Sequence, residues 1–174
     1  MLKGIGASPG IVLGKALVIE NTELVIERKT ITDTEAEVSK LRDAVAGSKE
    51  ELTKVKEKAL VELGEHEAQI FEAHLLVLED PELIGSAISK IRDEKVNADY
   101  ALNEIKEMFV AMFESMDNEY MRERAADIKD VTNRVLRHIL GIKVVDLAGL
   151  DEEVVLIAHD LTPSDTATMN KNMV

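Results

Sequence analysis

Metal binding through nitrogen or sulfur would depend on four histidines, because the chain contains no cysteine to form a zinc–thiolate site, a disulfide or a nucleophilic thiol. The residues three positions before His66, His74, His138 and His159 are Leu63, Phe71, Val135 and Leu156. None is acidic, so the Glu-x-x-His pairs of di-iron helical bundles are missing. His66 and His74 are eight positions apart, which does not match zinc ligands on one helical turn. We predict no metal site, and we expect each helical histidine at the surface or at the edge of the core.

A glycine-rich segment at residues 4–10, Gly-Ile-Gly-Ala-Ser-Pro-Gly, is a second candidate, because such segments can bind phosphate. A Walker loop places four residues between its glycines and ends in Lys followed by Ser or Thr. Here three residues separate Gly10 from Gly14, and Ala16 follows the lysine. A dinucleotide-binding fingerprint must open a helix, but this segment leads into the strand-like run 12–19. We therefore predict a structural turn before a strand, in which Pro9 fixes φ and Gly10 relaxes it.

The two ends of the chain have the pattern of one α/β unit. Residues 1–20 contain the first strand, and residues 142–174 contain a second apolar strand over 154–158. Thr162-Pro163 then opens a helix. A β–α unit normally continues to a further strand, whereas this sequence stops at Val174 soon after the helix begins. We expect that the chemistry of the unit lies outside these residues.

The middle of the chain has helical periodicity. A heptad seam predicts one long helix over about 34–62, with Ser48 as its single polar interruption. The apolar seam residues are Val38, Leu41, Val45, Leu52, Val55 and Ala59. Gly64 marks a break, and the next segment carries Ile70, Phe71, His74, Leu75 and Leu78 on one face. At Asp80-Pro81 the helix restarts, with Asp as its N-cap and Pro at its first position.

Two further amphipathic helices follow, and short connections predict that neighbouring helices are antiparallel, in two hairpins. Asp99 is expected to cap the next helix, and Asp117 or Asn118 the one after it, which Gly141 stops. Their apolar faces comprise Leu102, Ile105, Phe109, Met112, Phe113 and Met116, then Ile128, Val131, Val135, Ile139 and Leu140. The predicted fold class is α+β and mostly helical, with the two-hairpin helical subdomain inserted into a truncated α/β domain.

Composition restricts the class of protein. With 174 residues and 45% hydrophobic content, the chain can bury a real core as one domain or two small ones. No apolar run is as long as the roughly 18 residues of a membrane span, and no signal peptide is evident, so we expect a cytoplasmic protein. A net charge of −13 argues against nucleic acid, which requires clustered Lys and Arg. The charge favours a basic protein partner, or serves solubility alone.

Four blocks of the sequence together resemble Enzyme I, the phosphoenolpyruvate–protein phosphotransferase family of the bacterial sugar phosphotransferase system. The blocks are Gly-Ile-x-Ala-Ser-Pro-Gly-Ile-x-x-Gly-Lys-Ala at 4–16, Ile-Phe-Glu-Ala-His at 70–74 with Leu-Glu-Asp at 78–80, Glu-Tyr-x-x-Glu-Arg-Ala-Ala-Asp at 119–127, and Asp-Leu-Thr-Pro-Ser at 160–164. The resemblance implies a swivelling phosphohistidine domain made of 1–30 and 142–174. It also implies that residues 31–141 form the helical subdomain that binds the phosphocarrier protein HPr.

The same resemblance implies the mechanism. A histidine takes phosphate from phosphoenolpyruvate, bound on a separate C-terminal barrel domain that also makes the parent a homodimer, and passes it to HPr. The full-length enzyme needs magnesium, and this fragment would carry no cofactor and lack activity alone. The phosphohistidine motif would lie beyond Val174, so no catalytic residue is assigned here except Thr166 as possible support.

The resemblance further assigns a docking surface for HPr. Its apolar floor would be Leu76, Val77, Phe113, Met116 and Met121, and its acidic rim Glu65, Glu67, Glu72, Asp80 and Glu82. Arg124 would lie near the phosphate, although an ordinary ion pair with Asp127 also accounts for it. Three alternatives remain open: a nitrogen-regulatory or multidomain sugar-specific paralogue, a stand-alone helical interaction module, and a complete small enzyme.

Overall fold

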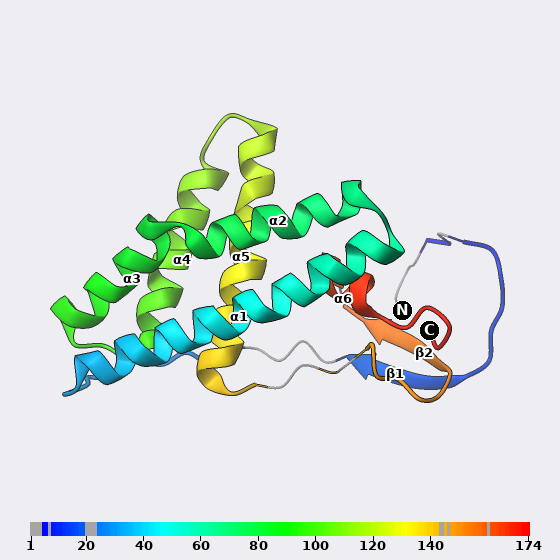
Figure 1. Ribbon diagram of the computed structural model, residues 1–174, viewed down its shortest axis with the longest axis horizontal. Helices are drawn as coiled ribbons and strands as arrows, with labels where there is room; N and C mark the ends of the chain where they lie inside the picture. The colour runs from blue at the N-terminus through cyan, green and yellow to red at the C-terminus, as the bar shows by residue number, and fades with distance from the viewer. Residues whose placement is uncertain (1–4, 7, 20–23, 143–144, 146, 160) are drawn as a thin grey trace.

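The computed structural model describes residues 5–6, 8–19, 24–142, 145, 147–159 and 161–174. Its elements are, in chain order, β1 (Lys15–Ile19), α1 (Thr34–Glu62), α2 (Glu65–Glu79), α3 (Pro81–Glu94), α4 (Ala98–Glu114), α5 (Glu119–Leu140), β2 (Val154–Ala158) and α6 (Pro163–Thr168). In Figure 1 the hairpin of α4 and α5 crosses the layer formed by α1 with α2 and α3, and the strands lie beside α6 at one end. The prediction of a mostly helical chain with a small sheet is confirmed.

Helix α1 has the bounds that the heptad seam predicted. It begins after Asp33, whose side chain accepts a hydrogen bond from the backbone N–H of Ala36 at 3.0 Å. The buried residues of α1 are Val38, Leu41, Ala44, Ser48, Leu52, Val55 and Ala59. Val45 was expected on this seam, but it is only half-buried and Ala44 takes its place. The expectation failed because a straight helix drifts from a strict seven-residue repeat.

Two interruptions separate α1, α2 and α3. Gly64 adopts φ +111°, a conformation that L side chains rarely adopt, and it precedes the first residue of α2. Asp80 accepts a hydrogen bond from the N–H of Glu82 at 2.8 Å and so caps α3, with Pro81 in the first turn. Both breaks are as predicted. Ile70 was expected on the inward face of α2 but is 44% exposed.

The start of α4 differs from its prediction. Asn97, not Asp99, is the N-cap residue, and its side chain makes no capping bond. Instead the Asn97 amide accepts from the backbone of Lys29 at 2.7 Å and donates to Asp99 Oδ1 at 2.7 Å. The N–H of Ala98 donates to Glu37 of α1 at 2.7 Å. A carboxylate from a distant helix therefore satisfies an N–H at this terminus, which local sequence could not indicate.

Helix α5 begins and ends where the sequence predicted. Asn118, one of its two candidate caps, accepts a hydrogen bond from the N–H of Tyr120 at 3.0 Å. Gly141 ends the helix with φ +67°. Of the apolar face expected for α5, Ile128, Val131, Val135 and Ile139 are buried, while Leu140 is half-buried.

Strands β1 and β2 pair in parallel, with Lys15 opposite Val154 and Ile19 opposite Ala158. The first strand was expected to begin at residue 12, but Val12 and Leu13 are exposed, because β2 offers no residue before Val154 to pair with them. Gly10 has φ +142°, in keeping with its predicted role. Two residues of the expected turn, Gly4 and Ala7, lie outside the described residues.

After β2, Thr162 and Asp165 form a reciprocal capping box that opens α6. This start was predicted from Thr162-Pro163, although Asp160 of the same sequence block lies outside the described residues. The backbone of Asn170 then donates to the carbonyl of Leu147 at 2.9 Å, and Val154 donates to Met173 at 2.8 Å. These bonds tie the last residues to the segment around β2.

Ser48 should limit the stability of the bundle. Its hydroxyl is fully buried on the α1 seam and has no hydrogen-bond partner among the described residues. A buried hydroxyl without a partner costs free energy, so Ser48→Ala should raise the free energy of unfolding by about 1 kcal/mol beyond the gain in helix propensity. Urea unfolding followed by circular dichroism measures this difference.

Ser39→Ala is the matched control, because Ser39 lies on the exposed face of the same helix. It gains the same helix propensity without removing a buried hydroxyl. If Ser48→Ala were less stable than Ser39→Ala, the hydroxyl of Ser48 would contribute to stability and the expectation would be wrong.

Candidate functional site

A groove with a volume of about 410 Å³ lies between α2, the start of α3, α4 and α5. Its lining is mostly apolar and includes two methionines. The polar positions carry a carboxylate, a phenol and a guanidinium. The lining residues are Ala73, Leu76, Val77, Asp80, Leu83, Phe109, Met112, Phe113, Tyr120, Met121, Arg124 and Ile128. Two helical hairpins therefore contribute to one surface, and neither could form it alone.

Six of the eleven residues assigned to docking line this groove. They are Leu76, Val77, Asp80, Phe113, Met121 and Arg124. Met116 is half-buried in the α4–α5 turn, where its N–H donates to the carbonyl of Phe113 at 3.2 Å, and it does not line the groove. The other four, Glu65, Glu67, Glu72 and Glu82, are exposed on α2 and at the start of α3. Of these, Glu72 pairs with Lys56 of α1 at 3.5 Å.

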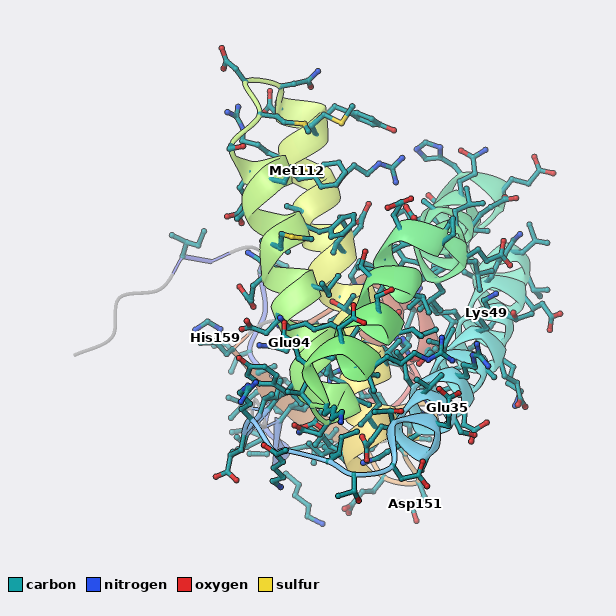
Figure 2. The ribbon with its side chains drawn as sticks, turned by 90° about the vertical axis from the view of Figure 1, so that its left-hand side faces the viewer. Glu35, Lys49, Glu94, Met112, Asp151 and His159 are labelled. Carbon is teal, nitrogen blue, oxygen red and sulfur yellow. The ribbon has the colours of Figure 1, made fainter. Side chains whose placement is uncertain are left out.

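Several lining residues were not predicted from the sequence. Met112 was expected to face inward, but it is 46% exposed and lies towards the end of the molecule where α4 meets α5 (Figure 2). Tyr120 is 57% exposed. A signal for Tyr120 was present, because it stands four positions before Arg124 and so lies on the same helical face. For Leu83 and Ile128 no local signal distinguishes groove lining from core.

Arg124 is held on the groove wall from two sides. Its Nη2 donates to the hydroxyl of Tyr120 at 2.6 Å, and its guanidinium carbon lies 5.0 Å from the centroid of that ring. Its Nη1 donates to Oδ2 of Asp127 at 3.3 Å. The hydrogen bond that Arg124 donates to Tyr120 is the main cause that raises the pKa of Arg124, so the side chain stays cationic. About one third of the side chain is exposed, which leaves it accessible to an anion.

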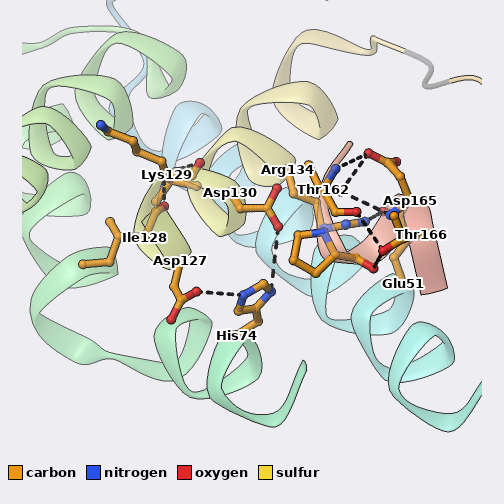
Figure 3. Close-up of polar contacts among 12 residues, drawn as sticks. Glu51, His74, Asp127, Ile128, Lys129, Asp130, Arg134, Thr162, Asp165 and Thr166 are labelled. Carbon is orange, nitrogen blue, oxygen red and sulfur yellow. Dashed lines mark hydrogen bonds and ion pairs between the residues drawn. The ribbon is translucent and has the colours of Figure 1, made fainter. Parts of the chain in front are cut away.

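His74 lies behind this wall, and its burial corrects an expectation. It was expected at the surface or at the edge of the core, yet it is only 1% exposed. Its Nε2 lies 3.3 Å from Asp127 Oδ1, and its Nδ1 lies 3.8 Å from Asp130 Oδ2 (Figure 3). Both carboxylates come from α5, one turn apart, so α2 inserts an imidazole between two acids. His66, by contrast, is exposed as expected.

Asp130 is a partly buried acid whose pKa is raised. Burial is the main cause that raises the pKa of its carboxyl, opposed by the charges of His74, Arg134 and Arg137. The negative charge of Asp165 on α6 raises this pKa further. Neither Asp130 Oδ2 nor His74 Nδ1 has a hydrogen-bond partner among the described residues.

A second, larger cavity of about 860 Å³ lies between α1, α5 and α6 and the segment before β2. On its wall, Glu51 of α1 accepts from Arg134 Nη1 at 3.0 Å and lies 3.0 Å from His138 Nε2. Gly47 permits this close approach, because a Cβ there would come within 3.0 Å of the His138 ring. Thr166 lies on α6 and its hydroxyl donates to the Pro163 carbonyl at 3.0 Å.

Within the described ranges, no three His, Asp or Glu side chains are arranged as a metal site would require. A search of the same residues finds no helix that is both long and apolar enough to cross a membrane.

Comparison with known proteins shows the family to which the chain belongs. The N-terminal region of PEP-utilising enzymes matches residues 3–124, and the chain belongs to this family. It is 57% identical over 173 residues to the phosphoenolpyruvate-protein phosphotransferase of Bacillus subtilis, covering 99% of this chain and 30% of that protein. The corresponding protein of Geobacillus stearothermophilus is 54% identical over the same shares. The chain therefore spans about 30% of the length of these curated relatives.

Solved structures agree with this assignment. An NMR solution structure of Enzyme I superimposes with a TM-score of 0.87 at 48% identity, over 99% of this chain and 71% of that one. The N-terminal domain of a protein described as Enzyme 1 - Nitrogen superimposes with a TM-score of 0.72 at 20% identity, over 97% of this chain and 69% of that one. That second likeness shows the fold alone. The resemblance to the N-terminal part of Enzyme I is confirmed.

Replacing Asp130 with Asn should change how stability depends on pH. Because the pKa of Asp130 is raised, the folded protein binds this proton more tightly than the unfolded chain does. The stabilisation is fully present below the unfolded pKa of about 3.9 and is lost as pH rises through the folded pKa. The amide does not titrate, so the free energy of unfolding of D130N, relative to the natural chain, should rise as pH increases above about 4 and level off once pH exceeds the folded pKa of Asp130.

Urea unfolding at a series of pH values provides the measurement. Asp117→Asn serves as the control, because Asp117 is exposed in the turn between α4 and α5. Its curve should run parallel to that of the natural chain. A D130N curve that is also parallel would contradict the assignment of a raised pKa.

Proposed function

We propose that this chain is the part of a phosphoenolpyruvate–protein phosphotransferase that docks the phosphocarrier protein HPr, and that docking takes place in the groove between α2, α4 and α5. The observation that carries the proposal is the convergence of Leu76, Val77, Phe113 and Met121 with Arg124 on one groove. Family membership supplies the reaction class, because the relatives are named for transfer from phosphoenolpyruvate to protein.

The floor of the groove has the chemistry of a transient interface. Met112 and Met121 contribute flexible, polarizable side chains, which adapt to a partner that must leave again. Phe113 and Tyr120 add aromatic surface, and the hydroxyl of Tyr120 accepts the hydrogen bond of Arg124. An apolar centre of this kind, surrounded by exposed charges, is the usual anatomy of a protein–protein interface.

The charges around the groove favour a basic partner. Asp80 lines the groove, and Glu65, Glu67, Glu72 and Glu82 are exposed on the helices that flank it. With a net charge of −13, the chain attracts a positively charged surface from a distance. Arg124 is the one cation among the described residues that line the groove, so a negative phosphoryl group has a single point of attraction there.

The phospho-acceptor histidine belongs, in this proposal, to a segment outside the present 174 residues. His74 is a poor acceptor because it is 1% exposed and its Nε2 is engaged with Asp127. His138 is engaged with Glu51. Thr166, on α6, is proposed to support the acceptor. Magnesium, the binding of phosphoenolpyruvate and a homodimer formed through a C-terminal domain are proposed for the whole protein, in the cytoplasm.

The order of the elements supports an insertion. Strands β1 and β2 are neighbours in one sheet, although α1 to α5 lie between them in the chain. We assign residues 31–141 to a helical subdomain for HPr, and residues 1–30 with 142–174 to part of an α/β phosphohistidine domain.

Two sets of substitutions should separate steering from contact. Reversing the charge of Glu65 and Glu82 to Lys should slow association with HPr and flatten its salt dependence, because charges act over about 8–10 Å at ordinary ionic strength. Met121→Ala should instead raise the dissociation rate about fivefold, because it removes a central apolar contact. Stopped-flow kinetics at several salt concentrations measure both effects.

The control for charge is reversal of Asp151 and Glu153, which gives the same change in net charge. Asp151 lies at the far end of the molecule from Met112 (Figure 2). Val61 is 85% exposed and lies outside the groove, so Val61→Ala is the control for Met121→Ala. In an NMR titration, shifts that fell on Leu41–Val55 and spared residues 65–83 and 113–124 would rule out the groove.

A chain of these 174 residues should take no phosphate from phosphoenolpyruvate. Incubation with labelled phosphoenolpyruvate and magnesium, with and without HPr, should leave the chain unlabelled, since the acceptor is proposed to lie elsewhere. Acid-labile label on His66 or His159, the two exposed histidines outside the ion pairs described above, would overturn that proposal.

A further inference from the structure

We propose that His74 is a positioning residue, which fixes Arg124 on the wall of the groove through the carboxylate of Asp127. The inference rests on the proposed function, in which Arg124 is the cation that meets the partner. It concerns a residue that touches neither the groove nor any partner: His74 is absent from the lining and is 1% exposed.

One carboxylate joins the two side chains. Oδ1 of Asp127 lies 3.3 Å from His74 Nε2 (Figure 3). Oδ2 of the same group accepts a hydrogen bond from Arg124 Nη1 at 3.3 Å. Because a carboxylate only accepts hydrogen bonds, Nε2 of the imidazole carries the hydrogen. Asp127 therefore has one oxygen bound to a buried donor on α2 and the other bound to the guanidinium of the groove.

The imidazole itself has little freedom. Its ring meets Phe71 edge-on, with centroids 6.0 Å apart and an interplanar angle of 86°. On its other side Nδ1 faces Asp130 Oδ2 at 3.8 Å, so the two ring nitrogens have distinct acidic neighbours. A ring flip would place carbon atoms where the two nitrogens now lie and so lose both acidic neighbours, and the buried surroundings oppose it. His74 is thus a rigid donor for Asp127.

Arg124 needs such an anchor. Its other contacts, the hydroxyl and ring of Tyr120, come from a side chain that is 57% exposed and so has little packing of its own. Tyr120, Arg124 and Asp127 all lie on α5, at spacings of four and three residues. The contact with His74 is the step that connects this surface group to the buried face of a different helix. Losing it would leave the guanidinium held by α5 alone.

A purely structural role for His74 predicts a different result from a positioning role, and the Arg124 guanidinium distinguishes them. NMR of its Nε–H and Nη–H signals reports rotation of the group in the free protein. We expect restricted rotation in the natural chain, averaged signals in His74→Leu, and restored restriction in His74→Gln, whose amide can still donate to Asp127. Unchanged Arg124 signals in His74→Leu, or free rotation in the natural chain, would overturn the proposal.

Binding of HPr supplies the second readout through a double-mutant cycle. His74→Leu should weaken binding roughly tenfold when Arg124 is present and should have little effect in the Arg124→Ala background. An equal loss in both backgrounds would mean that His74 acts by another route, and would contradict the proposal. Circular dichroism of every variant checks folding. If His74→Leu does not fold, His74→Met replaces it, because Met fills irregular space without offering a donor.

The guanidinium signals and the binding of HPr test separate claims. If the natural chain binds no HPr, the proposed function is wrong, while the guanidinium signals still decide whether His74 restrains Arg124. If HPr binds and the signals do not respond to His74, the docking function stands and the positioning role is lost.

Discussion

Burial of the α1 seam is the constraint on which the rest of the structure depends. Helix α1 contacts each of α2, α3, α4, α5 and α6, so it is the neighbour that all the other helices share. Its seam consists of medium and small apolar residues, among them Leu41, Leu52 and Ala59, each fully buried. Their burial supplies the free energy that orders the crossing hairpin, because hydrophobic gain scales with the apolar area removed from water. The groove lies beside this core, between α2, the start of α3 and the α4–α5 hairpin.

The groove itself combines two kinds of attraction with different ranges. In the proposed docking, acidic side chains on α2 and α3 act at a distance and set how often a partner arrives, whereas the methionines and aromatic rings act only in contact. Because the two functions are carried by different residues, each can change without the other. Arg124 is the exception, since it is a cation within an acidic surface and must be kept in place against nearby carboxylates by Tyr120 and Asp127.

Helices were more predictable from sequence than the site. The bounds of α1, the cap at Asp80 and the stop at Gly141 follow from local signals, and each was correct. The cap of α4 was not predictable, because the carboxylate that satisfies its backbone belongs to Glu37, far away in the chain. Met112 and Ile70 were misplaced for a related reason: helical periodicity identifies an apolar face but not where the neighbouring helix ends. Six of the twelve groove residues came from family resemblance, and the burial of His74 between two acids was missed because both acids belong to another helix.

The parallel pairing of β1 with β2 has a consequence for synthesis of the protein. Because all five helices α1 to α5 lie between β1 and β2 in the chain, β1 leaves the ribosome without its partner and stays unpaired until those helices have been made. Helices form from local contacts within microseconds, whereas a parallel pair must await its second strand and close a long loop. The nascent chain therefore completes its bundle while the apolar residues of β1, such as Val18, are still available to other strands. A chaperone that binds extended apolar segments could therefore bind β1 in the interval before residue 154 emerges.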